Sequence, residues 1–522
     1  MPDLTGLSDP IRAVYASCVD ECMAAIARHF NVKASGTTGT FDWQTQKLAE
    51  LGSLRREAAE IIARQLYGVD AMVAEAVEAA MLRSLREVEP ELQAAARAGL
   101  LQGAEPGMSP AMRLALDAYS RQAQEQLNLV NTVMLDSCLM NYRRIAANTA
   151  AYEQQLARAQ EILNAETGKV VSGVSSRQEA VRRAVRQFAD TGLTGFTDRA
   201  GHVWSPEAYA AMDVRTTVMN AAREAVLIRN EEYGNDLVSV PVNATARPKC
   251  YPWQGKVIST ADRPRIAHDL HGQPIQVHAR SATSYGDPDG LWGINCHHMP
   301  SPFFDGLSVL RGNVPPKADN DERYRLQQTQ RRYEREVRAR KREAVMLEAA
   351  GDEEGFREAA MKVKAAQRQL REHCEAGNLT MRHDRTQVLG YNRTVSRKAT
   401  AAADLQHKIE QIHQLIRSPA TPKHLNPGNQ NKHIPGANGY IEGRSYLYGT
   451  LADAQALVDR WHGTGEIRFT SRGEWVQKEF VTVSENIGVC IDPATGQGVP
   501  TNRFAIHYGK KGTHIVPARR EK

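Results

Sequence analysis

Amphipathic helical periodicity runs through the chain from Pro10 to about Leu163, and this pattern limits the fold more than any other feature. Further segments of the same kind are expected at residues 42–66, 69–88 and 110–165, with breaks at the glycines between them. No residues in these segments have catalytic spacing. Helices of this kind bury their apolar faces against other helices, within the chain or in another subunit. We therefore expect a helical assembly region.

The composition fits several packed units. A chain of 522 residues is too long for one core and suggests three or four units. Aromatic residues make up only 6% of it, and the abundance of Ala, Arg, Glu and Gln favours helices. The net charge of +6 permits contact with nucleic acid without requiring it. The seven scattered cysteines indicate a reducing compartment rather than a disulfide scaffold.

Two features argue against a membrane or secretory protein. No apolar run approaches the ~18 residues that a membrane helix needs. The first residues of the chain lack both the basic part and the apolar part of a signal peptide. We expect no membrane contact.

The composition changes over residues 238–312, which are rich in Pro, Gly, His, Trp and Cys. Helical periods are few there, so we expect a compact module of loops and strands. Before it, residues 175–230 continue in helical pattern, with a small hairpin insertion at residues 194–204.

Cysteines and histidines gather in this module, and both are preferred ligands of Zn²⁺. Their spacing is unfavourable, because the Cys-His-His run at residues 296–298 cannot easily present three side chains to one ion, and no Cys-x-x-Cys pair accompanies it. We expect no metal or other cofactor, and histidines that support a loop-rich core through hydrogen bonds. The alternative is a structural zinc held by Cys250, Cys296 and His298, with His271, His278 and His297 as further candidates.

Residues 315–376 form the most charged part of the chain. Gly351 divides them into two helices, which we expect to form an antiparallel hairpin. Their apolar stripe is thin, so we expect a solvated face with ion pairs four residues apart, such as Glu336 with Arg340. The alternative is that the arginines contact the phosphates of packaged DNA.

The end of the chain reads as a separate α+β unit. A helix at residues 400–416 is followed by a proline- and asparagine-rich linker at 418–431. Thr450 can cap a further helix. From residue 420 onward the chain holds 13 Lys and Arg against 9 Asp and Glu, which suits RNA. The expected helix lies at 451–462, and the expected strands at 466–469, 478–483, 488–491 and in a final hairpin.

The final hairpin brings two histidines together. Runs 503–508 and 513–516 flank a loop bounded by glycines. If Tyr508 pairs with Thr513, then His507 pairs with His514, because paired positions step away from a turn symmetrically. Alternation of side chains then puts these histidines and Arg503 on a polar face, opposite an apolar one.

Two neighbouring imidazoles suit cleavage of a phosphodiester. They tend not to be charged together, so one can act as base and the other as acid near neutral pH. In RNA, one histidine would deprotonate the 2′-OH and the other would protonate the leaving oxygen. Arg503, Lys510 and Lys511 would hold the phosphate and stabilise its developing charge. The alternative is an ordinary polar pair on a solvated sheet.

Short blocks at this end resemble the bacterial toxin 50 family over about the last ninety residues. The resemblance implies a polymorphic-toxin ribonuclease of the barnase, EndoU, colicin and RelE-like fold group. It extends the expected catalytic set of His507 and His514 to His433 and Thr513, and the phosphate-binding set to Lys432. Gly509 departs from the family, in which a small polar residue is expected. The blocks are Lys432-His433-Ile434-Pro435-Gly436, Ser445-Tyr446-Leu447-Tyr448-Gly449, Trp461-His462-Gly463-Thr464-Gly465, Lys478-Glu479-Phe480, Thr501-Asn502-Arg503, Ile506-His507-Tyr508 and Lys511-Gly512-Thr513-His514-Ile515-Val516-Pro517.

Two blocks of the central module resemble the phage minor capsid protein 2 family, which is related in role to MuF-like head proteins. They are residues 246–257, which include Trp253-Gln254-Gly255-Lys256, and residues 285–298, which end in Cys296-His297-His298. The resemblance extends from the N-terminal helices to about Asn392. Family members usually carry a histidine near position 250, where this chain has Cys250. The resemblance implies a virion protein near the portal, with portal and capsid proteins as partners.

The sequence thus predicts a phage minor head protein with a C-terminal, metal-independent RNase toxin. It would lie in the phage head, and in the bacterial cytoplasm during assembly and after delivery, with an immunity protein as a further partner. One alternative is a purely structural protein whose last domain is a binding module. Another is an ADP-ribosyltransferase as the C-terminal passenger, although residues 432–522 contain no Ser-Thr-Ser strand and no Glu-x-Glu motif. The expected units are a helical minor capsid region at 1–237, a loop-and-strand module at 238–312, a charged helical hairpin at 313–386, a helix and linker at 387–431, and a nuclease-like domain at 432–522.

Overall fold

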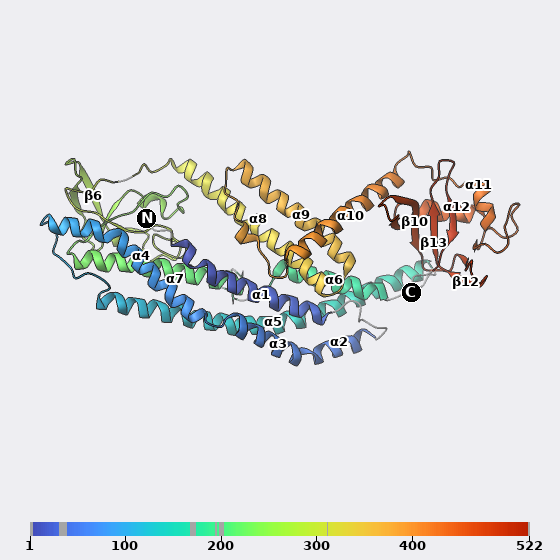
Figure 1. Ribbon diagram of the computed structural model, residues 1–522, viewed down its shortest axis with the longest axis horizontal. Coiled ribbons are helices and arrows are strands. Elements are labelled where there is room, and N and C mark those ends of the chain that lie inside the picture. Colours follow the sequence, from blue (N-terminus) through green and yellow to red (C-terminus); the bar gives the residue numbers. More distant parts are fainter. Residues whose placement is uncertain are drawn as a thin grey trace.

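The computed structural model describes residues 4–30, 39–167, 174–193, 196–197, 203–310 and 312–519. An elongated body of helices carries a β-rich module at each end (Figure 1). The expected multidomain class is confirmed: a mainly helical region, a loop-and-strand module and a small α+β C-terminal unit. Within the described residues, no helix combines the length and apolarity that crossing a bilayer requires.

The helices of the body follow the amphipathic pattern closely. The break expected near Gly52 separates two of them, and another runs past Pro90 because Leu92 and Ala95 continue its buried stripe. They are α1 (Asp9–His29), α2 (Thr40–Ala49), α3 (Leu51–Gln65), α4 (Val69–Arg97), α5 (Pro110–Thr167), α6 (Val174–Thr191), α7 (Pro206–Glu232), α8 (Lys317–Ala349), α9 (Glu353–Ala376) and α10 (Arg393–Arg417).

Helix α1 contributes to the two largest apolar cores of the body. Ile11 and Tyr15 pack into one core with residues of α4, α5 and α7. Cys18 and Cys22, one turn later, are fully buried in the other core, beside Cys138 of α5 and residues of α8 and α9. The two cores therefore meet along α1, and α5 also joins them, since its Val130 lies in one core and its Met134 in the other.

Helices α8 and α9 form the expected antiparallel hairpin, but the expectation of a solvated charged face is wrong for the C-terminal half of α8. Glu334, Lys341, Arg342 and Glu343 are buried. The reason is that these charges find partners on other elements, which local periodicity cannot reveal. The ion pair between Arg340 and Glu336 is present, at 2.9 Å.

A buried ion network joins α8 to two other helices. Arg342 donates from Nε to Asp20 Oδ1 of α1 at 2.6 Å, and from Nη1 to Glu207 Oε1 of α7 at 3.0 Å. Asp20 Oδ2 also accepts the backbone N–H of Leu389 at 2.7 Å. All three side chains are largely withdrawn from water, so their mutual pairing is what allows them to be buried.

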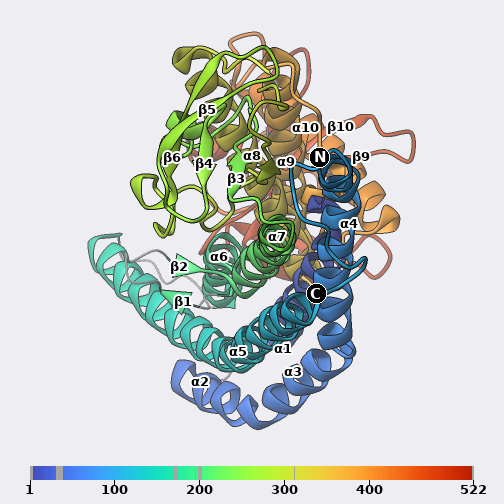
Figure 2. The same ribbon diagram turned by 90° about the vertical axis from the view of Figure 1, so that its left-hand side faces the viewer.

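The module at one end of the body is a five-stranded sheet of order β5-β6-β4-β3-β7. Figure 2 shows it on the opposite side of the body from α2 and α3. Strands β4 and β6 pair in parallel, and the other pairs are antiparallel. The small hairpin expected before α7 is present as β1 (Phe196–Thr197) with β2 (Val203–Trp204); the rest of that insertion lies outside the described residues. The sheet strands are β3 (Leu237–Ser239), β4 (Val257–Ser259), β5 (Arg265–His268), β6 (Pro274–Ala279) and β7 (Ser301–Pro302).

The C-terminal unit at the other end has two antiparallel sheets, of order β14-β13-β10-β9 and β12-β11-β8. Thr450 caps α12 (Leu451–Trp461) in a capping box with Asp453, as its position predicts. The sequence did not indicate β8, which has two residues, or β12, which contains glycine and proline. The strands are β8 (Tyr446–Leu447), β9 (Glu466–Phe469), β10 (Trp475–Thr482), β11 (Gly488–Ile491), β12 (Gly498–Thr501), β13 (Arg503–His507) and β14 (His514–Pro517).

Residues 418–431 differ from the expected linker because they pack onto the final hairpin. Leu425 is buried in the C-terminal core and bridges to Thr513. The Gln430 side chain accepts the N–H of Ile515 at 2.7 Å and donates to its carbonyl at 3.2 Å. Short helical turns, α11 (Pro427–Gln430) and η6 (Asn431–His433), follow from this docking. This segment is therefore part of the C-terminal unit rather than an extended spacer.

Replacing Arg342 by methionine should destabilise the helical body strongly. The variant keeps an unbranched apolar stem but leaves Asp20 and Glu207 buried without their cation, which costs about 3–5 kcal/mol. Urea denaturation followed by far-UV circular dichroism should show a lowered midpoint. Lys317→Met, which breaks an exposed ion pair with Asp321, is the control and should leave the midpoint unchanged. Equal midpoints for Arg342→Met and the unaltered chain would contradict the role of the network.

Candidate functional site

The final hairpin has the register that its sequence predicts. His507 of β13 pairs with His514 of β14, and Ala505 pairs with Val516. The two imidazole rings lie 4.5 Å apart, tilted by 43°. Gly512 makes the turn possible, because its φ of +115° and the carbonyl of His424, 2.8 Å from where a Cβ would lie, exclude a side chain. Both histidines are half-buried on the outer face of the sheet.

A third histidine joins this pair from before the unit's first strand. The ring of His433, in η6, lies 6.2 Å from that of His514 and nearly parallel to it. Its Nδ1–H donates to the carbonyl of Ser445 at 2.7 Å, which leaves the lone pair on Nε2. Gln430 holds η6 against β14 through the backbone of Ile515, so the position of His433 follows from the docking of residues 418–431. We call His433, His507 and His514 the histidine cluster.

Lysines are the charged neighbours of the histidine cluster. Lys478 of β10 lies directly across the sheet from His507. Burial lowers the pKa of His507 to about 3, assisted by His514, Lys478 and His433. Burial lowers the pKa of His514 to about 4, assisted by His433, Lys432 and Lys478. The cluster is therefore neutral at pH 7 and bordered by positive charge.

Burial also lowers the pKa of His433, although its hydrogen bond to Ser445 acts in the opposite direction. Arg444 and Lys432 add to the lowering of this pKa. The charged side chains that lower the pKa values of the three histidines are thus all cationic: Lys432, Lys478 and Arg444. An anion such as a phosphate would find complementary charge there.

Four expected site residues lie apart from the histidine cluster or are used structurally. Arg503 shares the face of His507 but is buried, where it pairs with Glu466 at 2.5 Å. Thr513 is fully buried on the core face and donates to the carbonyl of His424 at 3.2 Å. Lys510 and Lys511 are exposed in the loop. The structure brings together His433, His507 and His514 with Lys432, and adds Lys478.

Sequence reasoning did not place Lys478 beside His507, although the residue belongs to a block of the toxin resemblance. Which strand lies beside β13 is a long-range property, so no local signal pairs Lys478 with His507. The next residue, Glu479, points to the other face and is fully buried. It accepts the N–H groups of Gly463 and Gly465, at 2.9 and 3.0 Å, and the hydroxyl of Tyr508. This anchor fixes β10 against β13 and so fixes Lys478.

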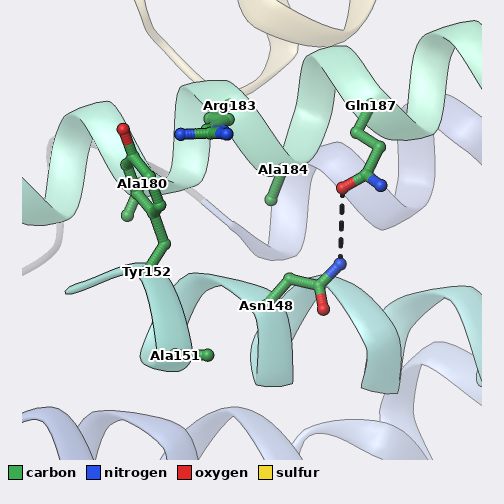
Figure 3. Close-up of a pocket in the computed structure, with 7 residues that line it drawn as sticks. All are labelled: Asn148, Ala151, Tyr152, Ala180, Arg183, Ala184 and Gln187. Carbon is green, nitrogen blue, oxygen red and sulfur yellow. Dashed lines mark hydrogen bonds between the residues drawn. The ribbon is translucent and has the colours of Figure 1, made fainter. Parts of the chain in front are cut away.

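A cavity of about 280 Å³ lies between α5 and α6, away from the histidine cluster (Figure 3). The guanidinium of Arg183 stacks on the ring of Tyr152 at 4.2 Å, and Asn148 donates to Gln187 at 3.4 Å. Among the described residues that line it there is no histidine, cysteine or carboxylate, so these side chains offer no acid, base or nucleophile. We do not assign it a catalytic role.

Of the six cysteines and histidines considered for zinc, the structure gathers three. Cys250, Cys296 and His298 are all buried, and their ligand atoms lie within 4.8 Å of one another. His271, His278 and His297 are not part of this group. Among the residues that the structure describes, it is the one group of three or more such side chains with metal-ligand proximity.

The lowered pKa values of the histidine cluster should make the C-terminal unit less stable in acid. An unfolded chain protonates its histidines below about pH 6.5, whereas folded His507 and His514 stay neutral down to about 3 and 4. The contribution of His507 and His514 to the free energy of unfolding is therefore full above about pH 6.5 and falls as the pH drops toward 4. Hydrogen exchange of residues 503–517 in the full chain, corrected for intrinsic rates, should show less protection at pH 5 than at pH 7.

The double variant His507→Gln, His514→Gln should lose most of this difference in protection. His407→Gln, on exposed α10, is the matched control and should keep it. An unchanged pH response in the double variant would show that other groups control the acid sensitivity.

The matches to known proteins separate the helical body from the C-terminal unit, as the structure does. The family model described as phage minor capsid protein 2 matches residues 2–375, and that of bacterial toxin 50 matches residues 425–517, which contain the histidine cluster. A structural protein of Lactococcus phage LL-H is 26% identical over 351 residues, which is 66% of this chain and 88% of that protein. A structural protein of Lactococcus phage mv4 is 29% identical over 105 residues, 20% of this chain and 85% of that protein. The chain therefore belongs to the phage minor capsid protein 2 family, with a C-terminal segment that matches bacterial toxin 50.

Proposed function

We propose that this phage minor capsid protein lies near the portal and carries a metal-independent endoribonuclease as its C-terminal unit. The observation that carries the proposal is the histidine cluster: His507 and His514 at 4.5 Å, with His433 beside them and lysines around them. The match to bacterial toxin 50 over the same residues supports a toxic activity. Portal and capsid proteins would contact the helical body, and an immunity protein would cover the cluster.

The geometry supports acid–base cleavage of RNA. One histidine of the pair takes the proton of the 2′-OH, which attacks the adjacent phosphate, and the other protonates the departing 5′ oxygen. Two imidazoles this close do not hold two protons readily, so they divide the two roles. His433, whose Nδ1–H is held by Ser445, presents Nε2 as an acceptor and is a second candidate for the base.

The positive charge for the transition state comes from Lys478 and Lys432 in this proposal. Both lie close enough to lower the pKa of His514, which supports a role for their charge at the reacting phosphate. Arg503 is engaged with Glu466, so it would brace the sheet rather than hold substrate. RNA binding in turn brings negative charge to the cluster, which raises the histidine pKa values and supplies the protonated acid.

The proposal for packaged DNA is weaker than that for RNA. Arg340 and Arg342 of α8 pair with the buried carboxylates of Glu343 and Asp20, whereas the exposed arginines of the helix are Arg323, Arg325, Arg332 and Arg335. Side chains held in this way are not available to phosphates without breaking their ion pairs. We place nucleic-acid binding at the C-terminal unit because the histidine cluster and the match to bacterial toxin 50 lie there.

The full chain should cleave total bacterial RNA in the presence of EDTA. His507→Ala, His514→Ala should lower the rate by at least about 10²-fold, because both proton transfers lose their catalyst. His407→Ala, on the exposed surface of α10, should leave the rate unchanged. A folded chain that does not cleave RNA, or a double variant that keeps full activity, would favour a binding module instead.

Activity should increase as the pH falls from 8 to 5. The free protein's acid has a pKa of about 4 or below, so its protonated fraction grows with each unit of acidification while the base stays neutral. The logarithm of kcat/KM against pH measures this directly. A profile that is flat over this range would contradict a histidine acid with a lowered pKa.

Lys478→Met should change two quantities at once. It removes a charge that attracts phosphate, so KM for RNA rises, and it removes a charge that lowers the histidine pKa values, so the profile shifts toward neutral pH. Lys510→Met, in the exposed loop, is the matched control and should shift neither. A Lys478→Met variant with wild-type KM and pH profile would exclude the proposed role of Lys478.

A further inference from the structure

Cys250, Cys296 and His298 come together in the β-rich module at the opposite end from the histidine cluster. Cys250 directly precedes the turn η3 (Tyr251–Trp253), and the other two lie in the loop before β7. Each side chain is at most 3% exposed. Two loops that are 46 residues apart in the chain thus meet at three potential metal ligands.

Two of the three distances between the ligand atoms match the edges of a zinc tetrahedron. Zn–S bonds of about 2.3 Å and Zn–N bonds of about 2.0–2.1 Å give S···S and S···N edges of roughly 3.8 and 3.6 Å. In the structure, Cys250 Sγ and Cys296 Sγ are 3.9 Å apart, and Cys296 Sγ and His298 Nδ1 are 3.5 Å apart. The third pair lies within 4.8 Å. Little movement would be needed to bind an ion.

The imidazole of His298 is oriented as in a metal ligand. Its Nε2–H donates to Oε1 of Gln254 at 3.5 Å, and that oxygen also accepts the backbone N–H of Asn243 at 2.5 Å. The lone pair of His298 is therefore on Nδ1, the nitrogen that faces Cys296. Metal-bound histidines commonly donate their second N–H to a carbonyl in this way.

Two arginines hold the loops and balance the charge of thiolates. Buried Arg223 of α7 donates to the carbonyls of Trp292 and His298, at 3.1 and 3.0 Å, and to that of Cys296. Arg247 places Nη2 4.0 Å from Cys250 Sγ. The backbone of the site is thereby fixed from the helical body without a metal, which reduces the ordering needed on binding.

A small cavity provides the remaining coordination position. Cys250, Cys296 and His298 line a space of about 20 Å³, together with polar residues that include Asn243 and Thr245. A water molecule needs about 10–15 Å³ by this kind of measure, so the space suits a fourth ligand.

We propose that Cys250, Cys296 and His298 bind one Zn²⁺ ion, with a water molecule from the cavity as the fourth ligand. Binding would release the thiol protons and join the two loops, so the ion would stabilise the module. Hydrogen-bonded histidines, which the sequence favours, account for the contact to Gln254 but not for a thiol–thiol–imidazole group with tetrahedral edges. The site is independent of the proposed ribonuclease.

Metal analysis of the full chain, produced with zinc and passed through a desalting column, tests the proposal. We expect one zinc per chain, and X-ray absorption should show two sulfur ligands. Cys250→Ser, Cys296→Ser should abolish zinc retention, whereas Cys374→Ser, which changes a buried cysteine of α9, should not. Gln254→Ala should weaken zinc binding about 10- to 100-fold without removing a ligand, as expected of a residue that positions His298.

Measurements on the unaltered chain keep the test independent of how the variants fold. Cobalt substitution should give the intense visible bands of a tetrahedral ion with thiolate charge transfer. After denaturation with a chelator, all seven cysteines should react as free thiols. Five reactive thiols would instead reveal a Cys250–Cys296 disulfide and overturn the proposal. A chain without zinc, or zinc retained by the double variant, would overturn it as well.

Discussion

Pairing of buried charges at the centre of the helical body is the interaction on which the remaining architecture depends. Helix α8 has too few apolar residues to be a central helix by hydrophobic burial alone, yet it lies against α1, α6 and α9. Arg342 can be buried because Asp20 and Glu207 receive its N–H groups, and Glu343 because Arg340 and Lys362 surround it. Once α8 is fixed, α9 packs on it and α10 packs on α9, so the position of the C-terminal unit also depends on this network.

The sequence allowed prediction of the features that local patterns control. The extent of α5, the cap at Thr450 and the pairing of His507 with His514 all follow from periodicity or turn symmetry. Features that depend on long-range contacts were missed or misjudged. The burial of α8 needs carboxylates about 135 and 322 residues away, and Lys478 becomes a neighbour of His507 only when β10 pairs with β13. Residues 418–431 have the composition of a linker, but their pairing with β14 through Gln430 gives them structure.

The histidine cluster and the Cys250–Cys296–His298 group share a principle of construction. Each is assembled from segments far apart in the chain, and each is held by polar side chains that bond the backbone of a neighbouring segment. Gln430 does this for His433, and Arg223 does it for the loop that carries Cys296 and His298. A backbone carbonyl or amide can form these hydrogen bonds whatever the side chain of its residue. The supporting residues therefore leave no short motif for sequence reasoning to find.

Helix α10 determines how the C-terminal unit is oriented relative to the helical body. Its first half buries Ala399 and Ala403 in the core of the body, and its second half buries Ile416 in the core of the C-terminal unit. The two parts are therefore joined by a stiff arm rather than a tether, with a largely exposed middle. The direction in which the histidine cluster faces therefore depends on the number of helical residues between the two cores. Each residue inserted between Ala403 and Ile416 would turn the whole unit by about 100° and advance it by about 1.5 Å.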